Sequence, residues 1–275
     1  MVARMDAPAL LYGTAWKEDD TERCVAAALA AGFRGVDTAN QRKHYFEAGV
    51  GRAVQAAIAS GAVSRDQLFL QTKFTFLDGQ DERLPYDAAA PVRTQVEQSF
   101  SSSLEHLGVT TLDSYVLHGP SARFGWREDD LEAWGAMEAL HARGAVAHLG
   151  VSNVSVDQLE AMLKLSKVKP SFVQNRCYAR TGWDSRTRAV CRQHSIRYQG
   201  FSLLTANPNV VGHAETSAIA RRRGLTPEQV IFRFALQLGM LPLTGTTNVE
   251  HMKLDLAVTQ FELDAAEMSR LEKLS

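Results

Sequence analysis

The stretch Leu112-Asp113-Ser114-Tyr115-Val116-Leu117-His118-Gly119-Pro120 is a short, largely apolar run that ends in a histidine and a turn. Similar runs recur along the chain and alternate with longer segments of helical period, which is typical of βα units around a parallel sheet. We predict strands at residues 10–13, 34–38, 68–73, 112–118, 146–151, 172–174, 197–202 and 241–245. Eight such strands that close on themselves form a (β/α)8 TIM barrel, a fold of roughly 250 residues.

The chain of 275 residues is therefore expected to be one α/β domain over residues 1–275, because no shift in composition marks a boundary or a linker. Capping residues predict helix starts at Ser155 and at Thr226-Pro227. An additional helix is predicted over residues 213–223, and residues 74–91 form the one long irregular loop.

The charge balance excludes several functional classes. Lys and Arg total 30 against 31 Asp and Glu, so no positive field is available to attract nucleic acid or an anionic membrane. The sequence shows no membrane-spanning or signal-peptide pattern, and we expect a cytoplasmic protein. Cys24, Cys177 and Cys191 lie far apart, which predicts reduced structural cysteines, no disulfide framework and no metal site.

Polar residues end most of the predicted strands. Asp37, Lys73 and His118 end three consecutive ones, and in this fold the active site lies at the carboxyl ends of the strands. The others end in Ser152-Asn153, Gln174-Asn175 and Phe201-Ser202. Each residue also has an ordinary explanation: Asp37 as a turn former, Lys73 as a surface residue and His118 as part of a turn. Their convergence on neighbouring strands favours a site in which charged groups tune one another.

With these residues in place, the chain resembles the aldo-keto reductases along nearly its whole length. The matching motifs are Tyr12-Gly13-Thr14-Ala15-Trp16, Gly32-Phe33-Arg34-Gly35-Val36-Asp37-Thr38-Ala39, Gln71-Thr72-Lys73, Leu112 to Pro120, and Leu149-Gly150-Val151-Ser152-Asn153. A Rossmann fold has little support, since Gly49-Val50-Gly51 lacks the last glycine of the dinucleotide-binding fingerprint.

The resemblance implies hydride transfer from a reduced nicotinamide to an aldehyde or ketone, with a tyrosine phenol protonating the forming alkoxide. Lys73 would lower the pKa of that phenol from its usual value near 10, and Asp37 would hold Lys73 in place. His118 would donate a hydrogen bond to the substrate carbonyl. The four catalytic residues expected are Asp37, Tyr45, Lys73 and His118.

The position of the catalytic tyrosine differs from the family pattern. The usual spacing places it five residues after the aspartate, but that position is Arg42 here, and the nearby phenol is Tyr45. The segment Gln41-Arg42-Lys43-His44 is interpreted as a lengthened loop, since the helix motif resumes at Phe46-Glu47. We expect a bulge to deliver Tyr45 to Lys73. The alternative is that Tyr45 only packs, and that His44 or water provides the proton.

For cofactor binding, the resemblance assigns Ser152, Asn153 and Gln174 to the nicotinamide carboxamide, Phe201 to stacking on its ring and Asp37 also to the ribose. It further assigns Gly13, Thr14, Ser202, Leu204, Gly245, Thr246, Thr247, Asn248 and His251 to the cofactor. The family's two cations for an adenosine phosphate are replaced by Gly245 and His251. Thr246, Thr247 and Asn248 at a helix N-terminus could still bind a phosphate, so NADPH is expected, with NADH possible.

The predicted substrate pocket is formed by Trp16, Phe74, Phe76 and Trp183, although aromatic residues near a barrel mouth are about as often packing residues. The expected partner is a small-molecule carbonyl substrate, and we expect a monomer. The competing hypothesis is a nicotinamide-binding regulatory or scaffold protein with little turnover. An unrelated barrel hydrolase or lyase is disfavoured, because the sequence has no activated nucleophile or metal-ligand cluster.

Overall fold

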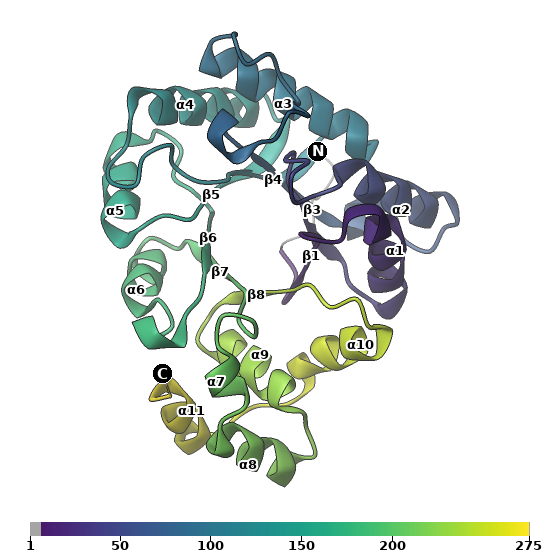
Figure 1. The fold of residues 1–275 in the computed structure, drawn as a ribbon, viewed down its shortest axis with the longest axis vertical. Helices are drawn as coiled ribbons and strands as arrows, with labels where there is room; N and C mark the ends of the chain where they lie inside the picture. Colours follow the sequence, from purple (N-terminus) through teal and green to yellow (C-terminus); the bar gives the residue numbers. More distant parts are fainter. Residues whose placement is uncertain (1–6, 275) are drawn as a thin grey trace.

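A computed structural model shows a closed barrel of parallel strands in the order β1 to β8, and it describes residues 7–274 (Figure 1). The strands are β1 (Leu11–Gly13), β2 (Gly35–Asp37), β3 (Phe69–Phe74), β4 (Leu112–Leu117), β5 (Val146–Ser152), β6 (Phe172–Arg176), β7 (Arg197–Phe201) and β8 (Leu241–Thr244). Strand β1 pairs with both β2 and β8, which closes the barrel. The predicted (β/α)8 fold and its eight strands are confirmed, with boundaries that differ by one or two residues.

Helices surround the barrel as an outer ring (Figure 1). They are α1 (Thr21–Ala31), α2 (Glu47–Ala59), α3 (Val92–Leu107), α4 (Glu128–Ala142), α5 (Val156–Leu165), α6 (Ser185–Gln193), α7 (Pro208–Val211), α8 (Ala214–Arg223), α9 (Pro227–Gln237), α10 (Val249–Ala257) and α11 (Ala265–Glu272). Short 3-10 helices cover Glu18–Asp20, Arg65–Gln67, Leu77–Gly79, Ala179–Thr181 and Val258–Gln260. None of the helices within residues 7–274 is long and apolar enough to cross a bilayer.

Local sequence explains where these helices begin. The Ser155 side chain accepts a hydrogen bond from the Gln158 backbone and starts α5, and Thr226 does the same with Gln229 at α9. Both are capping boxes, which satisfy backbone donors that a helix leaves free in its first turn. The predicted extra helix is observed as α8, and it is preceded by the short α7, which the sequence pattern did not indicate.

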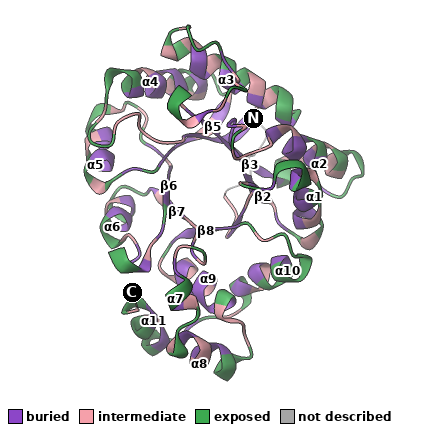
Figure 2. Ribbon diagram, viewed as in Figure 1, coloured by how far each residue is buried: buried purple, intermediate pink, exposed green. Residues whose placement is uncertain are grey.

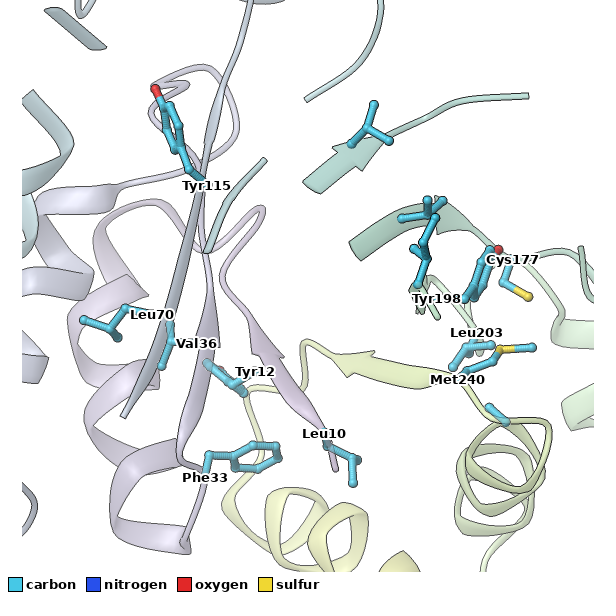
Figure 3. Packing of buried hydrophobic residues seen from close by; sticks show 14 of the residues in the cluster. Leu10, Tyr12, Phe33, Val36, Leu70, Tyr115, Cys177, Tyr198, Leu203 and Met240 are labelled. Carbon is cyan, nitrogen blue, oxygen red and sulfur yellow. The ribbon is translucent and has the colours of Figure 1, made fainter. Parts of the chain in front are cut away.

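The main core lies between the sheet and the helices. The ribbon of Figure 2 shows buried residues along the barrel strands and on the surrounding helices. Figure 3 shows part of this packing, in which Tyr12 of β1 faces Phe33 with ring centroids 5.5 Å apart. Helix α2 approaches α3 closely at Gly51, where an added Cβ would lie 1.8 Å from the His106 carbonyl oxygen. Only glycine fits at this crossing.

The barrel interior changes from apolar to polar along the strands. A cluster of Leu11, Phe69, Phe172, Leu241 and Leu243 fills one end. Successive strand residues point to opposite faces, so Phe69, Gln71 and Lys73 of β3 all point inward. The two polar ones lie toward the carboxyl end of the strand. The fold therefore places an apolar plug beneath a layer of buried polar side chains.

Candidate active site

The buried pair of Lys73 and Asp37 lies at the centre of the polar layer. The Lys73 ammonium contacts the two Asp37 carboxylate oxygens at 2.8 and 2.7 Å, and it also donates to the Thr38 carbonyl at 2.7 Å. Both side chains are almost fully buried, at 0% and 3% exposure. Burial lowers the pKa of Lys73, while the Asp37 charge acts in the opposite direction. The predicted pairing of these two residues is present.

Three glutamines complete the layer around Asp37. Gln71 and Gln174 each donate to Asp37 Oδ1, at 2.7 and 2.9 Å, and both also donate to Gln199 Oε1 at 2.8 Å. Gln199 returns a hydrogen bond to Gln71 Oε1. Sequence reasoning missed Gln71 and Gln199, although the two-residue alternation with Lys73 places Gln71 on the same face. This network links β2, β3, β6 and β7 beneath the barrel mouth.

Tyr45 reaches the site by way of a turn. The backbone N–H groups of His44 and Tyr45 both donate to the Gln41 carbonyl, at 3.2 and 3.0 Å, so the lengthened loop forms a compact turn before α2 begins at Glu47. The Tyr45 ring lies edge to face with the His118 ring at a centroid distance of 5.8 Å. The Lys73 ammonium lies 5.1 Å from the centre of the Tyr45 ring.

His44, the alternative proton donor, is placed differently. Its ring packs on the indole of Trp16 with centroids 3.9 Å apart, and its Nδ1 lies 3.0 Å from Gln41 Oε1. Tyr45 borders the cavity at the barrel mouth, and His44 is not among the residues that line it. The turn thus directs the phenol, rather than the imidazole, into the site.

The pKa of Tyr45 differs from the value that the sequence led us to expect. Burial raises the pKa of Tyr45, and the Asp37 charge raises it further, so the net shift is opposite to the lowering that was expected from Lys73. The physical reason is that Asp37 offsets the Lys73 charge within a water-excluded layer. Burial, with the charges of Lys73 and His44, lowers the pKa of His118 to about 3. Near neutrality, Tyr45 therefore keeps its proton and the His118 imidazole is uncharged.

A cavity of about 610 Å³ opens from these residues toward α9 and α10. The predicted residues that line it are Gly13, Trp16, Asp37, Tyr45, His118, Ser152, Asn153, Gln174, Phe201, Ser202, Leu204, Gly245, Thr246 and His251. Four of the predicted catalytic and cofactor-binding residues do not line it. Lys73 lies beneath its floor, buried Thr14 donates its hydroxyl to the Asp37 carbonyl, Asn248 caps α10, and Thr247 is exposed on the loop before α10.

The predicted substrate wall needs correction at three positions. Phe74 and Trp183 are completely buried in the main core, and neither they nor Phe76 border the cavity. Phe74 follows inward-facing Lys73 and so points outward to the helix layer, where it packs against Phe76 and Tyr86. Trp183 packs against Phe234 of α9, at 5.0 Å. Trp16 does border the cavity, and its side chain is 70% exposed.

Several lining residues were not predicted. Arg176 shares a face of β6 with Gln174, and its guanidinium lies 5.7 Å from the centre of the Phe201 ring. The strand alternation could have indicated it. Glu228 of α9 and Asp255 of α10 also line the cavity. Nothing in the sequence pattern marked these carboxylates, because they come from the helix layer rather than from strand ends.

Three residues of the cavity wall have left-handed backbone conformations. Trp16 has a φ of 61°, Asn153 a φ of 56° and Ser202 a φ of 57°. Such conformations cost about 1 kcal/mol or more outside glycine and are often found at functional sites. The Asn153 side chain donates to the His118 carbonyl at 2.8 Å, which ties the end of β5 to the end of β4. The unusual backbone at Asn153 thus supports the position of His118.

Comparison with known proteins identifies the family of this chain. The aldo/keto reductase family model matches residues 9–207 and 209–275. An aldo-keto reductase of Mycolicibacterium vanbaalenii is 32% identical over 255 residues, which covers 93% of this chain and 83% of that protein. An aldo-keto reductase of Mycobacterium marinum is 31% identical over 269 residues, covering 98% of this chain and 88% of the relative.

Solved structures share the fold at lower sequence identity. An aldo-keto reductase from a Medee basin deep-sea metagenome library superposes with a TM-score of 0.84 at 22% identity, covering 98% of this chain and 92% of its own. An aldo/keto reductase from Brucella melitensis gives a TM-score of 0.82 at 24% identity, covering 98% and 94% of the two chains. With the matching family model and curated relatives, the chain belongs to the aldo/keto reductase family of oxidoreductases.

Proposed function

We propose that this protein is a nicotinamide-dependent reductase that converts an aldehyde or a ketone to the alcohol, with Tyr45 as the proton donor. The observation that carries the proposal is the contact between the Tyr45 and His118 rings, 5.8 Å apart in the wall of a cavity that also reaches the Asp37 carboxylate. A protonated phenol and a neutral imidazole that lie side by side can both donate hydrogen bonds to the oxygen of a substrate carbonyl.

The cavity suits a nicotinamide cofactor. Asn153 Oδ1 and Gln174 Oε1 accept no hydrogen bond from any residue within 7–274, and both side chains border the cavity, so they offer acceptors for a carboxamide NH2. The Phe201 ring offers a flat stacking surface. When bound, the cofactor NADPH or NADH supplies the hydride.

The chain's own residues orient the substrate and move the proton. His118 is uncharged, and the Thr75 hydroxyl lies 2.7 Å from its Nδ1. If that hydroxyl donates to Nδ1, the Nε2–H is left to donate to the substrate carbonyl. Tyr45 then gives its phenolic proton to the developing alkoxide. The Lys73 ammonium, 5.1 Å from the Tyr45 ring centre, stabilises the phenolate that forms.

The test is steady-state oxidation of NADPH and NADH with a reactive aromatic aldehyde, comparing the parent with Tyr45→Phe. We expect the variant to lose at least about 100-fold in kcat while it retains cofactor affinity, because only the transferable proton is removed. His44→Gln is the matched control from the same turn and should retain activity. Equal rates for the parent and Tyr45→Phe would overturn the role of Tyr45. If the parent and both variants bind the cofactor tightly but none of them turns over, the protein is better explained as a nicotinamide-binding regulatory or scaffold protein.

A further inference from the structure

One end of the cavity is formed by Tyr45 and His118. The wall of its other end is formed by α9 and α10, which come much later in the sequence. Phe232 and Leu254 give this end an apolar surface, and Glu228 and Asp255 give it two carboxylates. If the nicotinamide binds beside Tyr45, as in the proposed function on which this inference rests, the adenosine of the same cofactor extends to this end. The side chains here then meet the adenosine ribose.

Positive charge is scarce at this end. Within residues 7–274, the cavity is lined by one arginine, Arg176, and two histidines, His118 and His251. Arg176 lies over the Phe201 ring of β7, and His118 lies beside Tyr45 at the other end of the cavity. Lys17 is close to Gly245 but is 7% exposed and does not border the cavity, and its ammonium already donates to the Gly245 carbonyl at 2.6 Å. A phosphate dianion at this end would have the His251 side chain as its main basic contact.

The N-terminus of α10 is also largely satisfied by its own cap. The Asn248 carboxamide oxygen accepts hydrogen bonds from the backbone N–H groups of Glu250 and His251, at 2.8 and 3.2 Å. The Thr246 hydroxyl accepts from the Asn248 N–H. These are donors that a phosphate at a helix N-terminus uses. Glu250 in the same turn forms an ion pair with Lys253 at 2.8 Å, so this pair adds no net positive charge that would attract an anion.

The two carboxylates favour a hydroxyl instead. Glu228 makes no ion pair or hydrogen bond with any other residue in the described part of the chain, so its carboxylate remains free to accept one. Asp255 accepts a hydrogen bond from the Thr244 hydroxyl at 2.7 Å, and its side chain is 4% exposed. A carboxylate accepts a hydrogen bond from a ribose hydroxyl, whereas it repels a ribose phosphate.

We propose that this end of the cavity selects an adenosine ribose without a 2′-phosphate, so that the protein prefers NADH to NADPH, with Glu228 as the main specificity-determining residue. The preference is the reverse of the one expected from the family resemblance. It arises because two carboxylates, Glu228 and Asp255, border this end of the cavity.

The experiment measures dissociation constants by titration calorimetry for NADH and NADPH and for the fragments ADP-ribose and its 2′-phosphate, which carry no nicotinamide. We expect the unphosphorylated form of each pair to bind at least about tenfold more tightly, since like charges placed together in an interface are costly. Glu228→Gln should reduce the ratio of the two dissociation constants several-fold, mainly because the phosphorylated ligand binds more tightly to this variant. His251→Arg should narrow it as well.

Glu128→Gln is the matched control, because Glu128 is an exposed carboxylate in the first turn of α4 and does not border the cavity. It should leave the ratio unchanged. Equal or tighter binding of NADPH by the parent, or a ratio that Glu228→Gln and Glu128→Gln change equally, would overturn this inference alone. Failure of both dinucleotides to bind would overturn the proposed function together with it.

Discussion

The rings of Tyr45 and His118 meet edge to face with their centroids 5.8 Å apart, although Tyr45 follows a turn after β2 and His118 directly follows β4. Their surroundings give the two side chains fixed protonation states near neutrality, a protonated phenol and an uncharged imidazole. The following predictions concern the groups that maintain this arrangement.

The low pKa of His118 predicts a pH effect on stability. An unfolded histidine gains a proton near pH 6.5, whereas folded His118 does so only near its pKa of about 3, so this residue destabilises the fold as the pH falls below about 6.5. His118→Gln should therefore lose less stability than the parent between pH 7.5 and pH 5, measured by urea unfolding. An NMR titration of the His118 ring with a midpoint near 6.5 would contradict the prediction.

Removal of one partner of the buried pair should be costly. Lys73→Met leaves the Asp37 carboxylate buried with only amide donors, and we expect the free energy of unfolding to fall by about 3–5 kcal/mol. The double variant Asp37→Asn with Lys73→Met removes both charges and should be more stable than Lys73→Met alone. Denaturant titration of the single and double variants measures this. A double variant that is the least stable of the set would exclude a charge-burial explanation.

His106 should contribute stability with the opposite pH dependence to His118. Its Nδ1 lies 3.0 Å from the buried Glu47 carboxylate, and this hydrogen bond raises the pKa of His106. The stabilisation is fully present below the unfolded pKa near 6.5 and is lost as the pH rises through the higher folded value. Unfolding curves for the parent and for His106→Gln should therefore differ more at pH 6 than at pH 9. A difference that does not vary with pH would refute the ion pair.

Gly51 should tolerate no side chain, because an alanine Cβ would lie 1.8 Å from the His106 carbonyl oxygen. Gly51→Ala is expected to destabilise the protein by about 3 kcal/mol or more, since the atom it meets is backbone and α2 and α3 must separate. Gly135→Ala, in the middle of α4, is the matched control, because the nearest atom to its Cβ is an Arg93 side-chain nitrogen at 3.9 Å. It should stabilise the protein by about 0.5–1 kcal/mol. Thermal unfolding of both variants tests the contrast.

The strand framework could be predicted from sequence because each strand is a short apolar run with a polar end. Asp37, Lys73 and His118 were found by this signal, and parallel strands necessarily bring their carboxyl ends together. An apolar run with a polar end does not show whether a given residue points into the barrel or toward the helices. That requires counting alternate residues from a neighbour whose direction is known. Phe74 was misplaced for this reason, since it directly follows inward-facing Lys73.

Other features depend on packing that no local pattern encodes. Glu228 and Asp255 come from the outer helices, and only the tertiary arrangement directs them to the cavity. The pKa of Tyr45 was predicted to fall on the basis of the Lys73 charge alone. The buried environment and the Asp37 charge, which raise it, become evident only when the three groups are placed together.

The turn formed by Gln41 to His44 has a consequence for how such proteins are recognised. It adds residues between Asp37 and Tyr45 while the phenol still reaches the ring of His118. A motif search that requires a fixed interval between the aspartate and the tyrosine would classify this chain as lacking the tyrosine. In this chain, the fold of the turn determines where the phenol lies, and the number of residues after the aspartate does not.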